Sequence, residues 1–264
     1  MLIPMTFRRI IPLSVKTALK RIYYFGNSCI CNVCHSRLRY FRPAGLAHEV
    51  IDELMIIGGG LYEHDICPVC LSSYRQRSLM LYLQKNKLIR NYASVLHIAP
   101  EVGLYRALKK NISGQYVCGD FDPQLYAEID SMVKIDVTKI AFPDNYFEFI
   151  LCNHVLEHIP ADLTAMKDIY RVLAIGGTAI LQVPISLLLS ETREGNGFEN
   201  EEQRISLFGQ KDHVRVYAMD YVNRLKSVGF LVSMVPVNSL IDSGNDGKMH
   251  LDEREILFVC SKNQ

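Results

Sequence analysis

From about residue 78 to the end of the chain, short apolar segments alternate with amphipathic ones, and this alternation constrains the fold more than any other feature. Seven segments have the length and apolar content of strands, at residues 94–99, 115–119, 132–137, 147–152, 178–183, 230–235 and 255–260. Helices are expected at residues 79–88, 102–110, 162–173 and 220–228. Strands that alternate with helices form a mostly parallel sheet that is covered on both faces. The sequence therefore predicts an α/β fold with a doubly wound, seven-stranded sheet, in which the last strand is antiparallel because no helix precedes it.

The 264-residue chain is long enough to bury one substantial core and a small accessory module. Hydrophobic residues make up 49% of the chain and charged residues 22%, a composition that excludes extended disorder. No apolar run reaches the roughly 18 residues of a membrane span, and the N-terminus lacks the features of a secretory signal. We therefore expect a cytoplasmic protein. In that reducing compartment, the eight cysteines indicate metal binding or isolated core thiols rather than disulfides.

Two Cys-x-x-Cys pairs, Cys31 with Cys34 and Cys67 with Cys70, are separated by one long loop. Each pair can present two thiolates on a tight turn at about 2.3 Å from a zinc ion, and two such turns complete a tetrahedron. The pattern predicts a structural zinc site that is closed by four thiolates and is therefore not catalytic. A redox-active pair is the alternative. Three further residues could replace a ligand: Cys29, His35 and His64.

These patterns divide the chain into a basic segment at residues 1–27 with a helix expected at 12–24, a four-cysteine zinc-binding module at 28–77, and an α/β domain at 78–264. The net charge is only +1, yet eight lysines and arginines precede the first acidic residue, Glu49. The basic segment could pack on the core, lie on an anionic membrane surface or contact nucleic acid. No aromatic-basic strip supports nucleic-acid binding. Packing and peripheral membrane contact both stay open.

The turn after the first expected strand is the candidate cofactor loop, because nucleotide sites in open parallel sheets lie at the carboxyl ends of the strands. It reads HIAPEVG, from His97 to Gly103, and compares with the pattern acid-x-Gly-x-Gly-x-Gly. His97 stands in place of the acid, Ala99 in place of the first glycine and Glu101 in place of the second. Only Gly103 is retained. This departure allows Glu101 to face the ammonium group of a bound cofactor.

Polar side chains also follow the next three expected strands. Asp120 ends the second strand, where a carboxylate can accept both ribose hydroxyls. Asp136 ends the third strand, from which a side chain can reach an adenine amine, and Asn153 and His154 end the fourth. Each acid could instead be a turn former or a helix cap. The succession of polar strand ends favours a nucleotide-containing cofactor.

The stretch FPDNYFEFILCNHVLEH, at residues 142–158, resembles the region around the fourth strand of class I S-adenosylmethionine-dependent methyltransferases. The resemblance extends through residues 170–184 and covers roughly residues 92–262. It implies a Rossmann-like methyltransferase domain at 78–264 that takes S-adenosylmethionine. By this resemblance, the turn at 97–103 would hold the methionine part, Asp120 the ribose, and Asp136 the adenine. Asn153 and His154 would lie beside the position of methyl transfer.

The chain is also similar to a narrower bacterial subgroup within the type 11 methyltransferases, which begins with a Cys-Pro-x-Cys knuckle and an arginine-rich helix start. Here these are Cys67-Pro-Val-Cys70 followed by Arg75 and Arg77, and the subgroup also carries the stretch LFGQKDHVR at residues 207–215. Several such proteins are linked with surface-polysaccharide genes. The resemblance thus implies a small or sugar-containing acceptor.

Methyl transfer is an in-line displacement that requires an aligned nucleophile and, for a hydroxyl or an amine, removal of a proton. His213 could be the base, oriented by Asp212, with Arg215 binding an anionic group of the acceptor. The alternative is that Asp212 and Arg215 form a local ion pair and His213 packs. His154 is a second candidate for the base, and Glu157 and His158 are further candidates.

The leading hypothesis is an enzyme that transfers a methyl group from S-adenosylmethionine to an oxygen or nitrogen atom. Two alternatives stay open: a zinc-containing binding or scaffold protein on a catalytically inactive methyltransferase fold, and an RNA methyltransferase. An NAD-dependent oxidoreductase would share the sheet but does not explain residues 136–184.

Overall fold

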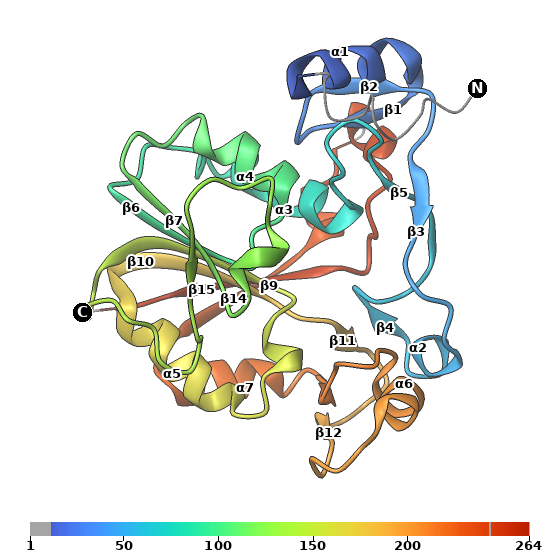
Figure 1. The fold of residues 1–264 in the computed structure, drawn as a ribbon. Helices are drawn as coiled ribbons and strands as arrows, with labels where there is room; N and C mark the ends of the chain where they lie inside the picture. Colours follow the sequence, from blue (N-terminus) through green and yellow to red (C-terminus); the bar gives the residue numbers. More distant parts are fainter. Residues whose placement is uncertain (1–11, 243, 264) are drawn as a thin grey trace.

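The computed structural model describes residues 12–242 and 244–263, with a seven-stranded sheet at its centre (Figure 1). The spatial order of the strands is β14-β15-β10-β9-β6-β7-β8. Their bounds are β6 Ser94–Ile98, β7 Gln115–Asp120, β8 Met132–Lys134, β9 Phe147–Asn153, β10 Leu173–Gln182, β14 Leu231–Pro236 and β15 Ile256–Ser261. Strands β6, β7, β8, β9 and β10 run parallel to one another, whereas β15 is antiparallel to both β10 and β14. The predicted α/β fold with an antiparallel last strand is confirmed.

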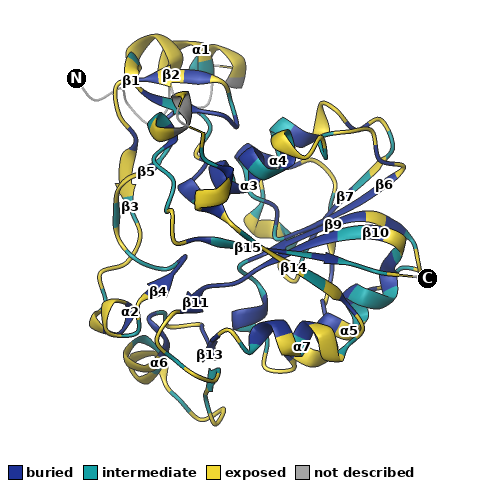
Figure 2. Cartoon of the chain, turned by 180° about the vertical axis from the view of Figure 1, so that it is seen from behind, coloured by how far each residue is buried: buried dark blue, intermediate teal, exposed yellow. Residues whose placement is uncertain are grey.

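Two helix layers cover the sheet (Figure 1), because successive side chains of its strands point to opposite faces. One face packs against α3 (Tyr74–Lys85) and α4 (Val102–Lys109), and its buried strand residues are Val95, Phe149, Leu151 and Ile180. The other packs against α5 (Asp162–Val172) and α7 (Tyr221–Ser227), and its buried strand residues are Leu96, Ile150, Cys152 and Leu181. Figure 2 shows the central strands buried along their length, as expected for a sheet covered on both sides.

The N-terminal part of the chain folds onto one side of this sheet domain. It contains α1 (Leu13–Tyr23), the antiparallel pair β1 (Phe25–Cys31) and β2 (Ser36–Leu38), and the antiparallel pair β3 (Arg42–Ala44) and β5 (Tyr62–Ile66). Cys31 and Cys67 share one hydrophobic cluster with Leu79 of α3 and Leu104 of α4. The cysteine region is therefore built against the sheet domain, and the expected boundary at residues 77–78 falls inside α3.

Short strands pair with one another in the loops that follow the sheet strands. After α2 (Glu49–Glu53), β4 (Ile56–Ile57) pairs with β11 (Ile185–Ser186), and β12 (Arg193–Glu194) pairs with β13 (Arg215–Val216). In the sequence, helix α6 (Glu201–Phe208) follows β12 and precedes β13. The remaining elements are short 3-10 turns: η2 Pro123–Leu125, η3 Leu156–His158, η4 Val237–Leu240 and η5 Asn245–Met249.

Several expected boundaries differ from the observed ones for local reasons. Helix α3 begins at Tyr74 rather than near residue 79, because the side chain of Gln76 accepts a hydrogen bond from the Ser73 backbone N–H and caps the helix start. Strand β10 begins at Leu173, before the double glycine, with a register shift between Leu173 and Thr178 that Gly176 accommodates at a φ of +75°. The helix expected at 12–24 is confirmed as α1, whereas residues 1–11 of the basic segment lie outside the described residues. Within the described residues, no helix has the length and apolar character needed to span a membrane.

Candidate active site and metal centre

A cavity of about 510 Å³ opens at the carboxyl ends of β6, β7 and β8. Three of the predicted cofactor residues line it: Ala99 after β6, Asp120 at the end of β7 and Asp136 just past β8. The cavity also has apolar walls, formed by Ile98, Phe121, Ile135, Val137, Val155 and Ile159. A cavity of this size with a few convergent polar groups has the character of a small-molecule site.

Ala99 shows how the altered glycine loop keeps its conformation. Its φ is +47°, in the left-handed region that glycine adopts most easily. Its backbone N–H donates to the carbonyl of Gly119 at 2.8 Å, which ties the turn to the neighbouring strand. The turn therefore has the backbone of a glycine position although the residue is alanine.

The two cavity carboxylates are oriented by neighbours on their own loops. Asp120 accepts hydrogen bonds from the Asp122 backbone N–H and the Tyr126 hydroxyl, both at 2.8 Å. Asp136 accepts from the backbone N–H and the hydroxyl of Thr138, at 2.9 and 2.6 Å, and these bonds lower the pKa of the Asp136 carboxyl. The same bonds would be expected if Asp120 and Asp136 only stabilised their turns. Both residues, however, also line the cavity.

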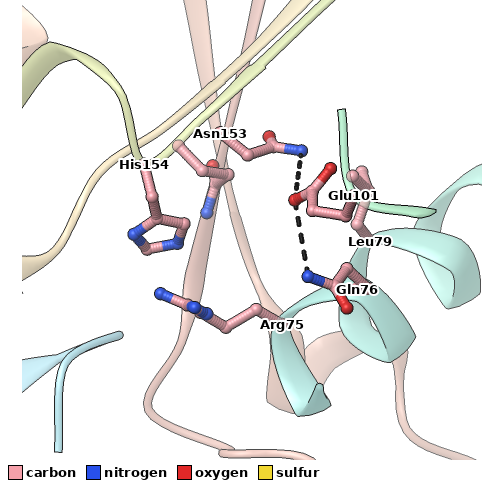
Figure 3. A pocket seen from close by; sticks show the side chains of 7 residues that line it. Arg75, Gln76, Leu79, Glu101, Asn153 and His154 are labelled. Atoms are coloured by element: carbon pink, nitrogen blue, oxygen red, sulfur yellow. Dashed lines mark hydrogen bonds between the residues drawn. The ribbon is translucent and has the colours of Figure 1, made fainter. Parts of the chain in front are cut away.

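Glu101 lies beside a second, much smaller cavity, whose lining includes Arg75, Gln76, Asn153 and His154 (Figure 3). His97 Nε2 lies 2.9 Å from Glu101 Oε2, and the Asn153 side-chain amide donates to Glu101 Oε1 at 3.2 Å. Burial raises the pKa of the Glu101 carboxyl, but these contacts outweigh it and the pKa is lowered. The loop thus presents a half-buried, ionised carboxylate to the small cavity. His154 lines both cavities and therefore lies between them.

Four predicted cofactor residues do not line the large cavity: Glu101 and Asn153 line the small one, and His97 and Gly103 line neither. His97 is fully buried on β6, where its Nδ1 lies 3.0 Å from the Tyr116 hydroxyl, so it acts on the site only through Glu101. Gly103 lies in the first turn of α4 against the cysteine region, and a Cβ there would come within 2.8 Å of the Cys70 carbonyl oxygen. The retained glycine is thus needed for the approach of α4 to the Cys67–Cys70 turn.

The proposed bases gather at the other wall of the large cavity, where His158 and Asp212 join His154 in the lining. Asp212 Oδ2 lies 3.4 Å from His158 Nδ1, so Asp212 orients His158 rather than His213. The His213 ring meets the His158 ring edge to face, with centroids 4.7 Å apart.

The buried groups at this wall have displaced pKa values. Burial lowers the pKa of His213 to about 4, and burial lowers the pKa of His154 well below its usual range. Burial also raises the pKa of Glu157 to about 8. Displaced values of this kind cluster at functional sites.

Arg215 has a structural role in this geometry. Its guanidinium donates to the backbone carbonyls of Leu156, Ile159 and Pro160 at 2.5 to 2.9 Å and contacts Glu194 Oε1 at 3.2 Å. The side chain is buried, and its donors fix the turn after β9. We therefore assign Arg215 to this turn and not to an anionic acceptor, and the alternative of an Asp212–Arg215 ion pair is replaced by pairs with Glu194 and Asp162.

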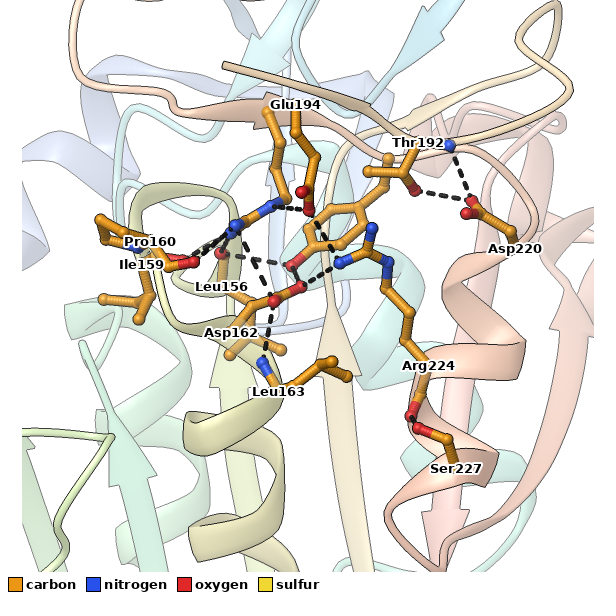
Figure 4. A network of polar contacts seen from close by, with 12 residues as sticks. Leu156, Ile159, Pro160, Asp162, Leu163, Thr192, Glu194, Asp220, Arg224 and Ser227 are labelled. Atoms are coloured by element: carbon orange, nitrogen blue, oxygen red, sulfur yellow. Dashed lines mark hydrogen bonds and ion pairs between the residues drawn. The ribbon is translucent and has the colours of Figure 1, made fainter. Parts of the chain in front are cut away.

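The same network continues to a buried carboxylate. Asp162 accepts from the Tyr217 hydroxyl at 2.7 Å and from Arg224 at 3.1 Å, and Glu194 contacts Arg224 at 2.8 Å. Figure 4 shows Asp162, Glu194 and Arg224 converging below the loop that follows β11. This network joins α5, α7 and the β12–β13 pair around the site.

The four predicted zinc ligands converge. The sulfur atoms of Cys31, Cys34, Cys67 and Cys70 lie within 4.8 Å of one another. Cys31 Sγ is 3.7 Å from Cys70 Sγ, and Cys34 Sγ is 3.8 Å from Cys67 Sγ. These distances are far longer than a disulfide bond. They match the edge of roughly 3.8 Å expected for a tetrahedron of sulfurs about 2.3 Å from zinc. The cluster could therefore form a zinc site.

Both cysteine turns have the same local backbone. The residue after each second cysteine, His35 or Leu71, has a positive φ, of 58° and 67°. The hydroxyls of Ser36 and Ser72 lie 3.2 Å from the sulfurs of Cys34 and Cys70. The two turns face each other, so their four sulfurs could hold a single ion. Cys29, His35 and His64 lie outside the four-sulfur cluster.

Arg75 and Gln76 are site residues that the sequence did not predict as such. The signal was present in the arginine-rich stretch that follows Cys70. Its two arginines separate by function. Arg75 lies in the small cavity (Figure 3), and its guanidinium donates to the Gly58 carbonyl at 2.7 Å. Arg77 is fully buried, stacks on Phe41 and donates to backbone carbonyls that frame the cysteine region.

A sheet of this order with a cavity at the carboxyl ends of its strands defines the class of Rossmann-like nucleotide-binding folds. Residues 90–181 match the family model described as a methyltransferase domain. This part of the chain is thus similar to a methyltransferase domain, in agreement with the Rossmann-like order of the sheet.

Solved structures share this fold at low sequence identity. The [4+2]-cyclase SpnF is 12% identical, with a TM-score of 0.50 over 71% of this chain and 82% of its own. An S-adenosylmethionine-dependent methyltransferase from Mesorhizobium loti is 11% identical, with a TM-score of 0.49 over 68% and 97% of the two chains. One from Archaeoglobus fulgidus is 12% identical, with a TM-score of 0.48 over 72% and 95%. A comparison with curated proteins gives no match.

Proposed function

We propose that the protein transfers a methyl group from S-adenosylmethionine to an oxygen or nitrogen atom of a small or sugar-containing acceptor. The observation that carries the proposal is the meeting of Ala99, Asp120 and Asp136, from three successive strand ends, in one cavity of about 510 Å³. S-adenosylmethionine, when bound, supplies the methyl group on a positively charged sulfur.

The side chains fit the parts of that molecule. Asp120 can accept the ribose hydroxyls, while Asp136 can accept the adenine amine between the apolar Ile135 and Val137. Glu101 and the Asn153 side-chain oxygen, a buried atom without a partner among the described residues, suit the ammonium group. Arg75 suits the carboxylate of the methionine part. Residue types and charges thus match the cofactor from end to end.

The acceptor would enter beside the wall formed by His154, His158 and Asp212. The ring nitrogens of His154 are buried and form no hydrogen bond among the described residues, although Nδ1 lies 3.4 Å from Glu157 Oε1. A neutral imidazole of this kind can accept a proton from an acceptor hydroxyl or amine. His213 lies behind His158, which favours His154 over His213 as the base.

A turnover assay tests the proposal. The purified protein is incubated with methyl-labelled S-adenosylmethionine and a panel of hydroxylated and amino-substituted sugars. Label in an acceptor, together with release of S-adenosylhomocysteine, is expected and should fall at least ~10-fold in His154→Ala. A cofactor that binds but is never turned over with any acceptor, including RNA, would favour the scaffold alternative.

We also propose that the four cysteines hold one structural zinc ion, because four thiolates close the coordination shell and leave no position for a substrate. The Cys67–Cys70 turn lies next to Gly103 in the first turn of α4, and none of the four cysteines lines the large cavity. The contribution of the zinc site is to hold α3, and with it Arg75, against the sheet.

For α1 we propose peripheral contact with an anionic membrane. Val15, Leu19 and Ile22 are spaced along one face of this helix and are 45%, 55% and 76% exposed, with Lys20 and Arg21 beside them. Sedimentation with phosphatidylserine-containing vesicles tests it. Binding is expected for the unaltered chain and for Phe198→Asp, an exposed apolar site elsewhere. Loss in Ile22→Asp supports the proposal, and no sedimentation of the unaltered chain refutes it.

A further inference from the structure

Glu157, His158 and His213 form a cluster of ligand atoms at the acceptor wall of the large cavity. One ligand atom from each residue lies within 4.8 Å of the other two. Glu157 and His158 belong to η3, directly after β9, whereas His213 lies just before β13. The cluster is separate from the four cysteines.

The backbone holds the two parts of this cluster together independently of the three side chains. The N–H of Val214 donates to the Glu157 carbonyl at 3.0 Å. Arg215 donates to the carbonyls of Leu156 and Ile159 on either side of the turn. The side chains of Glu157 and His213 are therefore brought to one point by a preformed scaffold, as a binding site requires.

Glu157 supplies an observation that packing does not explain. Its side chain is 1% exposed, and its Oε2 atom has no hydrogen-bond partner among the described residues. Its Oε1 atom lies 3.4 Å from His154 Nδ1. A buried carboxylate oxygen without a partner is costly, and a bound cation is its natural complement.

We propose that Glu157, His158 and His213 bind a divalent first-row transition metal ion. Two imidazoles and one carboxylate are the ligand set for such ions, and the set leaves coordination positions open. Magnesium and calcium prefer sites made of oxygen ligands and fit less well. Asp212, which contacts the His158 ring, would fix the orientation of that ligand.

The position of the cluster gives the ion a role, and this consequence rests on the proposed methyl transfer. His158 also lines the large cavity, so an acceptor hydroxyl can fill an open position on the ion. The hydroxyl would then lose its proton more easily to His154, the base proposed above, which lies beside Glu157. Its oxygen lone pair forms the new C–O bond as the C–S bond breaks and its electron pair passes to sulfur. The structure thus favours an acceptor with a metal-binding hydroxyl group.

Cobalt titration of the full chain, with zinc already loaded, tests the proposal in the absence of S-adenosylmethionine. Equilibrium dialysis should give one Co²⁺ per chain in addition to zinc. The visible spectrum of the bound Co²⁺ should lack the thiolate charge-transfer band that cobalt in the cysteine site would give. Glu157→Gln and His158→Ala should each weaken binding at least ~10-fold, whereas His48→Ala, at a histidine outside the cluster, should leave it unchanged.

His158 is partly exposed, with 31% of its side chain accessible, so its removal should leave the fold and the zinc content intact. The proposal is overturned if no cobalt binds beyond the zinc-site background. It is also overturned if both cluster variants bind cobalt as tightly as the unaltered chain does. A separate titration with S-adenosylhomocysteine distinguishes failure of the metal-site proposal from failure of the proposed methyl transfer. Cobalt binding without S-adenosylhomocysteine binding would leave the metal site standing and refute only the proposed methyl transfer.

Discussion

His97 and Glu101 lie four residues apart and are joined by a 2.9 Å contact between Nε2 and Oε2 across the turn after β6. The sequence pattern expects an acid at position 97 and a glycine at 101. In this chain the acidic residue is at position 101, and the histidine at position 97 contacts the Glu101 carboxylate and orients it. The loop therefore keeps a carboxylate beside the cofactor cavity although only one of its three glycines remains.

This exchange predicts that Glu101→Gln weakens S-adenosylhomocysteine binding about 10-fold or more, because a hydrogen bond to a charged group contributes about 1.5–3 kcal/mol. His97→Gln should show a smaller loss, since the carboxylate stays but is less firmly oriented. Glu128→Gln, at an exposed ion pair with Arg106, is the matched control and should bind normally. Calorimetric titration measures all three. Equal affinity in Glu101→Gln and the control would mean that Glu101 only braces the loop.

The cysteine cluster predicts one zinc ion per chain. Cys70→Ser should lose this zinc and lower the melting temperature, because the metal contributes to folding directly. Cys118→Ala is the control, since Cys118 lies on β7 away from the cluster and should keep the zinc. Elemental analysis and thermal unfolding provide the measurements. A Cys70→Ser protein with full zinc content would show that another residue completes the site.

Asp162 is predicted to be a main contributor to stability around the site. Its side chain is 5% exposed and receives bonds from Tyr217 and Arg224. Asp162→Ala removes the nearest acceptor of the Tyr217 hydroxyl and one of the two carboxylates that pair with Arg224, and it should lower the free energy of unfolding by about 3–5 kcal/mol. Asp144→Ala removes an exposed partner of Arg171 and should lower it by about 1 kcal/mol at most. Urea unfolding compares the two, and similar losses would argue against a buried network.

Glu255 makes stability depend on pH. Burial raises the pKa of this carboxyl to about 7, partly offset by Arg75, and its Oε1 accepts a bond from Gln182 at 3.3 Å. The folded chain thus keeps a proton that the unfolded chain releases above its ordinary pKa of 4.5. This stabilisation is complete below pH 4.5 and is lost as the pH rises through 7.

Glu255→Gln should remove that dependence. Between pH 5 and 8, the unfolding free energy of the unaltered chain should fall relative to the variant by up to about 3 kcal/mol. Urea unfolding at the two pH values measures the difference. A gap that does not change with pH would mean that Glu255 is already ionised in the folded chain at pH 5.

The sheet and the cysteine cluster could be predicted because their signals are local. An apolar run such as residues 147–152 indicates a buried strand whatever the rest of the fold is. Each Cys-x-x-Cys pair likewise defines its own turn, and the site requires only that the two turns come together. The same holds for Asp120 and Asp136, whose positions follow from where a strand ends.

The role of Arg215 could not be predicted in this way. Its partners include Glu194, 21 residues away in the chain, and carbonyls after β9 such as that of Leu156, 59 residues away. The sequence does not show which hydrogen-bond donors are already paired. The meeting of Glu157 with His213 depends on the same long-range contact. Gly103 was assigned to the cofactor from its motif, but its neighbour across the interface is Cys70, which the motif does not contain.

The central claim is that the cavity at the strand ends binds S-adenosylmethionine through Asp120, and calorimetric titration of the zinc-loaded chain with S-adenosylhomocysteine tests it most directly. We predict micromolar binding that Asp120→Ala weakens at least ~10-fold, by loss of bonds to a charged acceptor. Asp130→Ala, at an exposed aspartate outside the cavity lining, should bind as the unaltered chain does. No heat and no thermal stabilisation in a folded sample would contradict the claim, and so would undiminished binding by Asp120→Ala.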